Sequence, residues 1–373
     1  QVPPPNDVEL APAVVALPAD EPLANAPNNP GGSRLTVILR LRTDDGLEGI
    51  GITYLGAALT RSLRHATQAL GELAIGEDAA DIPLIRKKLF AAAGGSGPEG
   101  MFSLALAALD IALWDIAGKA KGEPLWKLVG ASGAPVPCYA SGAMMRELDL
   151  GTAVKAAGRL VESGFTAMKF QLGLPGPFNL DAEIERARLI RESAGDEVAL
   201  MCDVNQRWSL EEALKIGPRL DEYALTWLED PIAYDDVDGL ARLTEALKTD
   251  IAAGEYLYRP SAFRHMLEAQ ALDMVMIDPF RAGGITGWLE IAALAHRFGK
   301  RVVSHLAPEV QLHLIGAIPN GWIVEYMPWF NALYEEVVWP RDGMLAMPEK
   351  PGLGVAFDRR ALARYTVEEA SSK

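Results

Sequence analysis

Three carboxylates that recur at one spacing are the residues best suited to chemistry in this 373-residue chain. Asp203, Glu229 and Glu255 each end a short apolar run, and the intervals from 203 to 229 and from 229 to 255 are both 26 residues. One acid among 50 Asp and Glu would indicate little, but three at matched positions indicate a shared site. Carboxylates brought together repel one another unless a cation lies between them. Because Mg²⁺ prefers hard oxygen ligands, the spacing predicts a magnesium site.

A second group of ionisable residues continues the series. Asp278 and His305 follow the next two apolar runs, about one further interval apart, and His305 is one of only five histidines. An Asp that orients a His and raises its basicity is a familiar general base, so this pair is the candidate acid/base catalyst. Glu325 ends the last run of the series, and Lys169 with Gln171 ends an earlier one.

The runs that carry these residues are typical of parallel strands. Amphipathic stretches such as Leu180 to Glu192 and Gly287 to Phe298 lie between them, and strands that alternate with helices form parallel sheets. The expected strands are Pro137 to Ser141, Ala167 to Gln171, Ala199 to Asp203, Leu225 to Glu229, Ile251 to Glu255, Met274 to Asp278, Arg301 to His305 and Trp322 to Glu325. Eight such strands fit a closed barrel of the TIM type, whose catalytic groups sit at the carboxyl ends of the strands.

The residues before about Gly130 have a different texture. Leu35 to Arg42 and Leu47 to Tyr54 alternate in polarity around an Asp-Asp-Gly turn, which predicts a β-hairpin. Helices are expected at Thr60 to Ala74, Ile82 to Ala92 and Met101 to Lys121, the last one buried because it is apolar on nearly every face. We therefore divide the chain into an N-terminal domain of mixed strands and helices (1–130), a barrel (131–338) and a C-terminal segment that returns to the N-terminal domain (339–373).

Composition excludes several classes of function. The formal net charge of −15 argues against nucleic acid and against an anionic membrane surface as partners. The apolar run Met101 to Ala117 is too short and too acidic to cross a bilayer. Cys138 and Cys202 lie inside apolar runs and are expected to be free thiols. The first residues show no signal-peptide pattern, so a cytoplasmic enzyme is the default expectation.

The motifs in their order resemble the mandelate racemase branch of the enolase superfamily along nearly the whole chain. The resemblance is carried by ALDIALWDIAGKAKGEPLWKLVG (108–130), GFTAMKF (164–170), DVNQRW (203–208), WLEDP (227–231), GE (254–255), DPFRAGGITGW (278–288) and SHL (304–306). It implies a modified TIM barrel, (β/α)7β, with an α+β N-terminal capping domain. It also implies a homo-oligomer that acts on a small-molecule carboxylate with Mg²⁺ as cofactor.

The resemblance assigns roles to the individual residues. It implies that Asp203, Glu229 and Glu255 bind Mg²⁺, that Asp278 and His305 form the acid/base dyad, and that Glu325 hydrogen-bonds a substrate carboxylate oxygen. Glu325 could donate that bond if it were protonated, and Lys169 could add positive charge or act as a second base. Loops near Pro22 to Ser33 and Tyr54 to Ala57 would close over the substrate; by composition alone, the first is more simply a surface loop. Further substrate contacts are expected from Tyr54, Tyr139, Ser141, Gln171, Asn205 and Arg281.

One departure from the family pattern narrows the chemistry. The usual Lys-x-Lys pair is here Lys169-Phe170-Gln171, and Gln cannot take a proton at neutral pH. A two-base racemase is therefore disfavoured. Dehydration needs one group only, because His305 can remove the α-proton to give an enediolate and then protonate the departing 3-hydroxyl. The sequence favours a lyase that converts an aldonate or aldarate to a 2-keto-3-deoxy acid.

Other functions stay open at this point. An epimerase, a racemase or a lactone cycloisomerase of the same superfamily could use the same metal site. A metal-binding protein without turnover is a third possibility, in which Gln171 marks a decayed site, although the intact set of Asp278, His305 and Glu325 argues against it.

Overall fold

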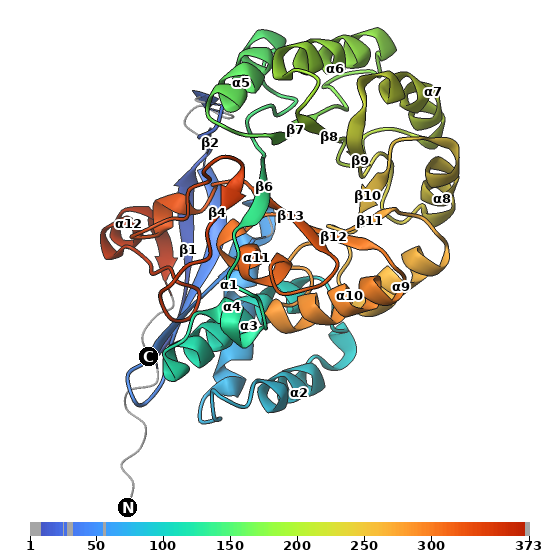
Figure 1. Ribbon diagram of the computed structural model, residues 1–373. Coiled ribbons are helices and arrows are strands. Elements are labelled where there is room, and N and C mark those ends of the chain that lie inside the picture. Colours follow the sequence, from blue (N-terminus) through green and yellow to red (C-terminus); the bar gives the residue numbers. More distant parts are fainter. Residues whose placement is uncertain (1–8, 25, 28–32, 55–56, 370–373) are drawn as a thin grey trace, which may run out of the picture.

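The computed structural model describes residues 9–24, 26–27, 33–54 and 57–369. Within them the chain forms a parallel barrel and an antiparallel sheet that packs beside it with its own helices (Figure 1). The fold is the expected modified TIM barrel with an α+β N-terminal capping domain.

The barrel is formed by strands β6 to β13, which pair in sequence order and close through a parallel pairing of β13 with β6. Their bounds are Val136–Ala140, Ala167–Gln171, Ala199–Asp203, Leu225–Glu229, Ile251–Ala253, Met274–Ile277, Arg301–Ser304 and Gly321–Tyr326. A short strand β14 (Met344–Leu345) adds to β6 in the antiparallel sense. Most residues of these strands are buried, as parallel strands covered on both faces must be.

Helices follow the barrel strands and form its outer wall (Figure 1). They are α5 (Leu150–Glu162), α6 (Leu180–Ala194), α7 (Leu210–Leu220), α8 (Val237–Ala246), α9 (Pro260–Glu268), α10 (Ile285–Arg297) and α11 (Pro308–Ile315). Inside the barrel, the side chains of Tyr139, Met201 and Trp227 belong to one buried apolar cluster. The barrel is therefore a packed core, and its polar groups gather at one end.

Four strands of the barrel end earlier than expected, and the first of them is β6, which stops at Ala140 and leaves Ser141 outside the ladder. Strand β10 stops at Ala253, β11 at Ile277 and β12 at Ser304, so Glu255, Asp278 and His305 stand just beyond the ladders. Glu325 differs in the other direction, because β13 continues through it to Tyr326. The apolar runs locate the strands well, but polarity alone does not show where the backbone leaves the sheet.

The capping domain contains the sheet β15-β1-β4-β5. The expected hairpin is present as β4 (Ser33–Arg42) and β5 (Glu48–Thr53). Strand β1 (Glu9–Pro18) was not expected, because Pro12 and Pro18 break the pattern that identifies a strand. Two-residue strands β2 (Asp20–Glu21) and β3 (Ala26–Pro27) pair with each other.

The C-terminal residues run back to this sheet. Helix α12 (Arg359–Tyr365) contacts β1, and β15 (Thr366–Glu369) pairs antiparallel with β1 (Figure 1). The three expected helices of the capping domain are α1 (Thr60–Ala74), α2 (Ile82–Ala92) and α3 (Met101–Lys121), and a short α4 (Leu125–Leu128) follows.

Helix α3 forms the core of the capping domain and also makes contacts that join this domain to the barrel and the C-terminal segment. The whole helix is longer than the apolar run 101–117, and by length and composition it could cross a membrane, contrary to the expectation from that run. However, 83% of its most apolar stretch is buried inside the protein, as in a core helix. Its two acids are fully buried. Asp110 binds Arg86 and accepts a hydrogen bond from Thr286 N at the start of α10. Asp115 accepts from Ile50 N in β5 and from Leu353 N in the C-terminal segment.

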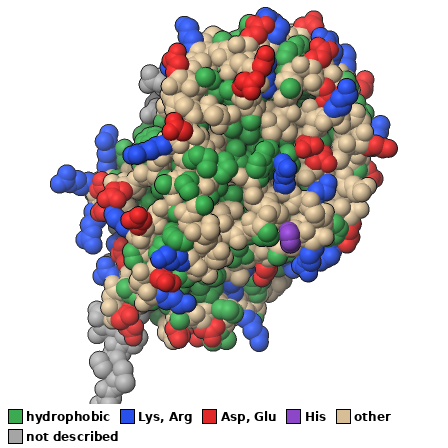
Figure 2. Space-filling model, viewed as in Figure 1, with side chains coloured by type: hydrophobic (Ala, Val, Ile, Leu, Met, Phe, Trp, Pro, Cys, Tyr) green, Lys and Arg blue, Asp and Glu red, His purple; other side chains and the backbone are tan. Residues whose placement is uncertain are grey.

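The molecular surface carries acidic and basic side chains side by side on the face shown in Figure 2. No continuous basic area is visible on that face, which agrees with the formal net charge of −15.

We predict that Gly51→Ala destabilises the capping domain, because a Cβ at this position would lie 2.0 Å from the backbone oxygen of Ala108 in α3. Overpacking of this kind costs about 1–3 kcal/mol. Thermal unfolding should show a lower Tm, while Gly95→Ala, where a Cβ meets open space, should leave the Tm unchanged. Equal Tm values for the two variants would contradict the close packing of β5 on α3.

Candidate active site

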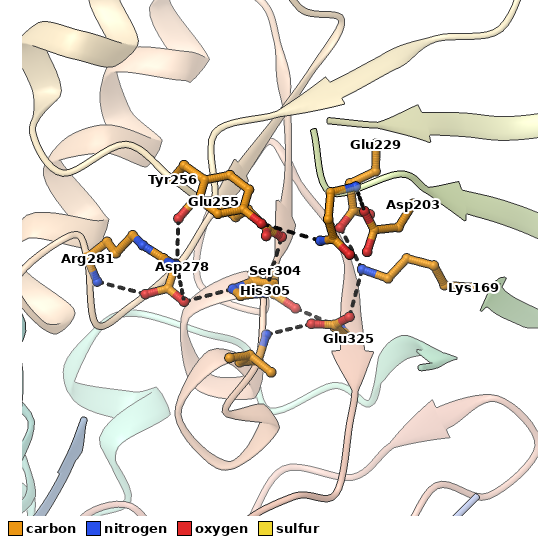
Figure 3. A network of polar contacts seen from close by, with 12 residues as sticks. Lys169, Asp203, Glu229, Glu255, Tyr256, Asp278, Arg281, Ser304, His305 and Glu325 are labelled. Atoms are coloured by element: carbon orange, nitrogen blue, oxygen red, sulfur yellow. Dashed lines mark hydrogen bonds and ion pairs between the residues drawn. The ribbon is translucent and has the colours of Figure 1, made fainter. Parts of the chain in front are cut away.

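The polar residues at one end of the barrel come from neighbouring strands held in register. Gln171 on β7 is paired with Asp203 on β8, and Asp203 with Glu229 on β9. Glu255, Asp278, His305 and Glu325 follow around the same end, and Figure 3 shows them with Lys169 in one network of polar contacts. The three expected metal ligands and the expected dyad therefore lie in one site.

Glu255 reaches this network through a glycine. Gly254 adopts φ +130°, a conformation that L side chains rarely take, and a Cβ there would lie 2.5 Å from the carbonyl oxygen of Met276. Glycine is therefore the residue that lets the chain turn out of β10 directly into the site.

Lys169 is held between two carboxylates. Its Nζ lies 2.6 Å from Glu229 Oε1 and 2.8 Å from Glu325 Oε1, and all three side chains are almost completely buried. Trp227 Nε1 donates to the other Glu229 oxygen at 3.0 Å. Burial alone would lower the pKa of Lys169, but Glu229 and Glu325 outweigh it and raise that pKa well above its usual value. In this arrangement Lys169 is a fixed cation.

The dyad has the expected geometry. His305 Nδ1 lies 2.7 Å from Asp278 Oδ2, so Asp278 fixes the imidazole and leaves Nε2 directed into the site (Figure 3). Arg281 N donates to Asp278 Oδ1 at 2.7 Å, and Arg281 Nη1 donates to the backbone oxygen of Glu255 at 3.1 Å. His305 Nε2 also lies 3.1 Å from Glu255 Oε2. Burial disfavours the imidazolium, but Glu255 and Asp278 outweigh it and raise the pKa of His305 to about 9.

Glu325 is an acceptor in this arrangement. Its Oε2 accepts from Leu306 N at 2.6 Å, and its other oxygen faces Lys169. Burial raises the pKa of Glu325, but Lys169 and His305 outweigh this effect and hold the pKa to about 2. In this arrangement Glu325 accepts hydrogen bonds from its neighbours, and its expected bond to a substrate carboxylate oxygen stays a prediction.

Gln171 is fully engaged by neighbouring groups. Its amide nitrogen donates to Asp203 Oδ2 and to Asn205 Oδ1, both at 3.0 Å, and its oxygen accepts from Arg146 N at 3.3 Å. Asp203 also accepts from Asn205 N at 2.7 Å. The flank opposite His305 is therefore made of amide groups and one buried arginine.

The charge balance of the site fits a divalent cation. Asp230, next to Glu229 in sequence, is fully buried with φ +39°, and neither carboxylate oxygen has a hydrogen-bond partner among the described residues. Glu255 Oε2 has no hydrogen-bond partner there either, and its one ion-pair contact among the described residues is with His305 Nε2 at 3.1 Å. Burial raises the pKa of Glu229 and Asp230 well above normal, with a further rise from neighbouring carboxylates; at Glu229 the attraction of Lys169 opposes this rise without cancelling it. Such crowded oxygens are the ligand type that Mg²⁺ takes.

The carboxylates do not converge on a single point in this arrangement. Among the described residues, no three His, Cys, Asp or Glu side chains form a ready metal-binding group. The reason lies in their partners, since Lys169 engages Glu229, Gln171 engages Asp203 and His305 engages Glu255. The metal-ligand roles of Asp203, Glu229 and Glu255 stay a prediction.

The other expected substrate contacts are spread more widely. Tyr139 is fully buried in the barrel core, packed edge-on against Trp227, and its hydroxyl donates to Ser304 O at 3.2 Å. Ser141 is also buried, after β6. Tyr54 follows β5 and contacts the rings of Trp329 and Phe330 beyond β13. Of the two expected lid loops, residues 25, 28–32 and 55–56 lie outside the described residues.

Three residues of the site were not expected from the sequence. Asp230 lies in the WLEDP motif and could have been singled out as a fourth acid beside Glu229. Tyr256 follows Glu255, and its ring packs against Arg281 at 5.0 Å. Arg146 lies between β6 and α5 with no motif to mark it, because its partners come from β7 and β8.

Comparison with known families decides the class of this site. Residues 14–130 match the mandelate racemase / muconate lactonizing enzyme N-terminal domain, and residues 152–361 match the enolase C-terminal domain-like family. The chain belongs to the mandelate racemase subgroup of the enolase superfamily. Enzymes of this superfamily use Mg²⁺.

Similar members of this family include dehydratases and cycloisomerases. The chain is 35% identical to L-talarate/galactarate dehydratase of Salmonella typhimurium over 87% of its own length and 81% of that protein. It is 31% identical to 3,6-anhydro-alpha-L-galactonate cycloisomerase of Streptomyces coelicolor, covering 89% and 91% of the two chains.

Solved structures agree with these similarities. A mutant of L-talarate/galactarate dehydratase liganded with Mg and L-glucarate superimposes with a TM-score of 0.89 at 32% identity, covering 98% of this chain and 93% of that one. L-talarate dehydratase from Polaromonas sp. JS666, complexed with Mg and L-glucarate, gives 0.88 at 30% identity, covering 97% and 98%.

We predict that Glu255→Gln weakens Mg²⁺ binding by more than about 100-fold, because even a lost outer-shell partner costs roughly 10–100-fold in metal affinity. Isothermal titration with MgCl₂ measures this directly. The matched control is Glu309→Gln, which removes another buried carboxylate, on α11, where it accepts a hydrogen bond from Tyr334 outside the site. The same Mg²⁺ affinity in both variants would rule out Glu255 as a ligand.

Proposed function

We propose that the protein is a Mg²⁺-dependent dehydratase of an acid sugar, an aldonate or aldarate, that forms a 2-keto-3-deoxy acid. The asymmetry of the site carries this proposal. On one flank Asp278 orients His305, which can accept and release a proton. On the other flank the corresponding position is Gln171, whose amide cannot do either at neutral pH. Dehydratases among the relatives support the reaction class.

The reaction uses His305 and Asp278 in two successive proton transfers. A cation held by Glu255 would weaken the attraction between Glu255 and the imidazolium that raises the pKa of His305. Neutral His305 Nε2 then takes the proton α to the substrate carboxylate, and Asp278 stabilises the imidazolium that results. The same imidazolium then gives its proton to the 3-hydroxyl, which leaves as water. The enol product tautomerises to the 2-keto-3-deoxy acid. Proton removal and hydroxyl departure therefore take place on one face of the substrate.

The negative charge that develops on the substrate carboxylate must be balanced. Asp203, Glu229 and Glu255 would hold Mg²⁺, which supplies positive charge next to the carboxylate oxygens. Lys169 adds a second fixed cation from the interior of the barrel. Because Lys169 Nζ is bound to two carboxylates, its place in the site is that of a charge and not of a second base.

A cycloisomerase is the second candidate. The cycloisomerase of Streptomyces coelicolor is 31% identical to this chain, and such a reaction also begins with removal of one α-proton. The leaving group separates the two functions: a dehydratase releases water from an open-chain acid sugar, whereas a cycloisomerase opens a ring and loses no atoms. Product mass therefore distinguishes them.

We predict that His305→Asn abolishes formation of 2-keto acid, with a loss of at least about 10³-fold, because the base and the acid of the reaction are the same group. The assay incubates a library of acid sugars with Mg²⁺ and traps 2-keto acids, with deuterium uptake at the α-carbon followed in D₂O. His296→Asn, an exposed histidine on α10, is the matched control and should keep full activity. No turnover and no His305-dependent exchange with any substrate would refute the dehydratase.

We also predict that Gln171→Lys adds α-proton exchange from the face opposite His305, and with it measurable epimerisation. The new amine would lie near the Arg146 guanidinium, which shares Asn205 Oδ1 with the Gln171 nitrogen, and a positive neighbour lowers a lysine pKa towards the range of a useful base. Asp203, 3.0 Å from the same nitrogen, opposes this effect, and a cation bound to Asp203 would weaken that opposition. NMR of the substrate recovered from D₂O detects both changes. Gln171→Met is the control without an amine. If both variants lack exchange at that face while retaining dehydration, Gln171 does not face the α-carbon.

A further inference from the structure

Arg146 is a buried cation at the edge of the site. It lies between β6 and α5 and is 8% exposed. Its Nε donates to Leu172 O at 2.8 Å, just beyond β7, and its Nη2 donates to Asn205 Oδ1 at 2.7 Å, just beyond β8. Nη2 also lies 3.4 Å from Asp203 O. The guanidinium therefore ties together the ends of two strands on the flank opposite His305.

These contacts fix the orientation of the Asn205 amide. A guanidinium is only a donor, so the side-chain group that faces Arg146 must be the Asn205 oxygen. Gln171 Nε2 donates to the same oxygen. The Asn205 nitrogen is thereby turned the other way, towards Tyr256 OH at 3.4 Å. Asn205 has φ +46°, a left-handed conformation in which Asn is tolerated better than most residues.

Gln171 and Asn205 consequently differ in what they can offer a ligand. Both hydrogens of the Gln171 amide are used, by Asp203 and Asn205, and its oxygen accepts from Arg146 N. Asn205 uses one hydrogen towards Tyr256, and its side chain is only part-buried, so one hydrogen is left for an incoming oxygen. On this flank the donor available to a substrate is therefore Asn205, and not Gln171.

We propose that Arg146 is a positioning residue that holds Asn205 as a hydrogen-bond donor to a hydroxyl or carboxylate oxygen of the substrate. This inference rests on the proposed function for the identity of the substrate class. The flank that lacks a base then has a definite role, because it binds an oxygen of the acid sugar while His305 does the proton transfers. The expectation that Gln171 contacts substrate directly is replaced by Asn205 acting with Arg146 behind it.

The first test needs no substrate. A double-mutant cycle with Arg146→Met and Asn205→Ala is followed by thermal unfolding. If the guanidinium holds Asn205, the Asn205→Ala change lowers the Tm in the wild type but by less than half as much in the Arg146→Met background. The control cycle replaces Arg146→Met by Arg188→Met, an exposed arginine of α6 that pairs with Glu185 and Glu192. Additive Tm shifts in the first cycle would overturn the contact.

The second test measures ligand binding without turnover. In the His305→Asn background, titration with the acid sugars of the library should show each single variant binding about tenfold more weakly and the double variant no weaker than the poorer single one. Arg146→Lys keeps the charge but cannot bridge Leu172 O and Asn205 together, so it should resemble Arg146→Met. Full affinity in Arg146→Lys would show that charge alone matters and would overturn the positioning role.

The two proposals fail separately. Coupled Tm values and coupled acid-sugar binding, with no 2-keto acid formed by the wild type, would refute the dehydratase and leave the role of Arg146 standing. Formation of 2-keto acid, with single-variant effects on affinity that add up, would refute the role of Arg146 and leave the dehydratase standing. If no acid sugar binds to the wild type, the substrate class is wrong, and the donor role of Asn205 proposed for that class is wrong with it.

Discussion

The burial of like charges is the constraint on which the rest of this molecule depends. Six carboxylates gather at one end of the barrel and are almost fully excluded from water: Asp203, Glu229, Asp230, Glu255, Asp278 and Glu325. Unpaired charges in such surroundings cost several kcal/mol each. Cationic side chains among these carboxylates offset part of this cost. Lys169 is the most central of them, since it forms ion pairs with both Glu229 and Glu325. The site is thus built around an unfavourable charge density that a bound divalent ion would relieve.

The same constraint explains why the two flanks of the site differ. On one flank Asp278 and Glu255 contact the imidazole of His305, which can be protonated and deprotonated. On the other flank Arg146, Gln171 and Asn205 form a network of permanent donors and acceptors. A group that carries no exchangeable charge cannot compete for protons with the opposite flank. Proton transfer is therefore confined to the His305 side of the site, and the metal ligands alone would not impose this asymmetry.

Much of the barrel could be predicted because its signal is local. Most barrel strands are short apolar runs, and a polar residue of the site stands at or just after the end of the run. Asp203, for example, follows four apolar residues of β8. Strand β1 could not be predicted in the same way, because Pro12 and Pro18 obscure it and its partners lie on β4 and β15. The role of Arg146 and the pairing of Glu325 with Lys169 depend on contacts between distant strands, for which one sequence carries no pattern.

The pairing of β15 with β1 joins the two ends of the described chain in one sheet. During synthesis β1 is made before the barrel and β15 after it, so the capping sheet keeps an open edge at β1 until β15 has been made. Exposed edges invite pairing with other chains, and domains made early usually fold early. Here the barrel, whose strands follow one another along the chain, can close before the sheet that covers it is finished. Because β15 follows the barrel in the chain, the capping sheet can be completed only after the barrel has been synthesised.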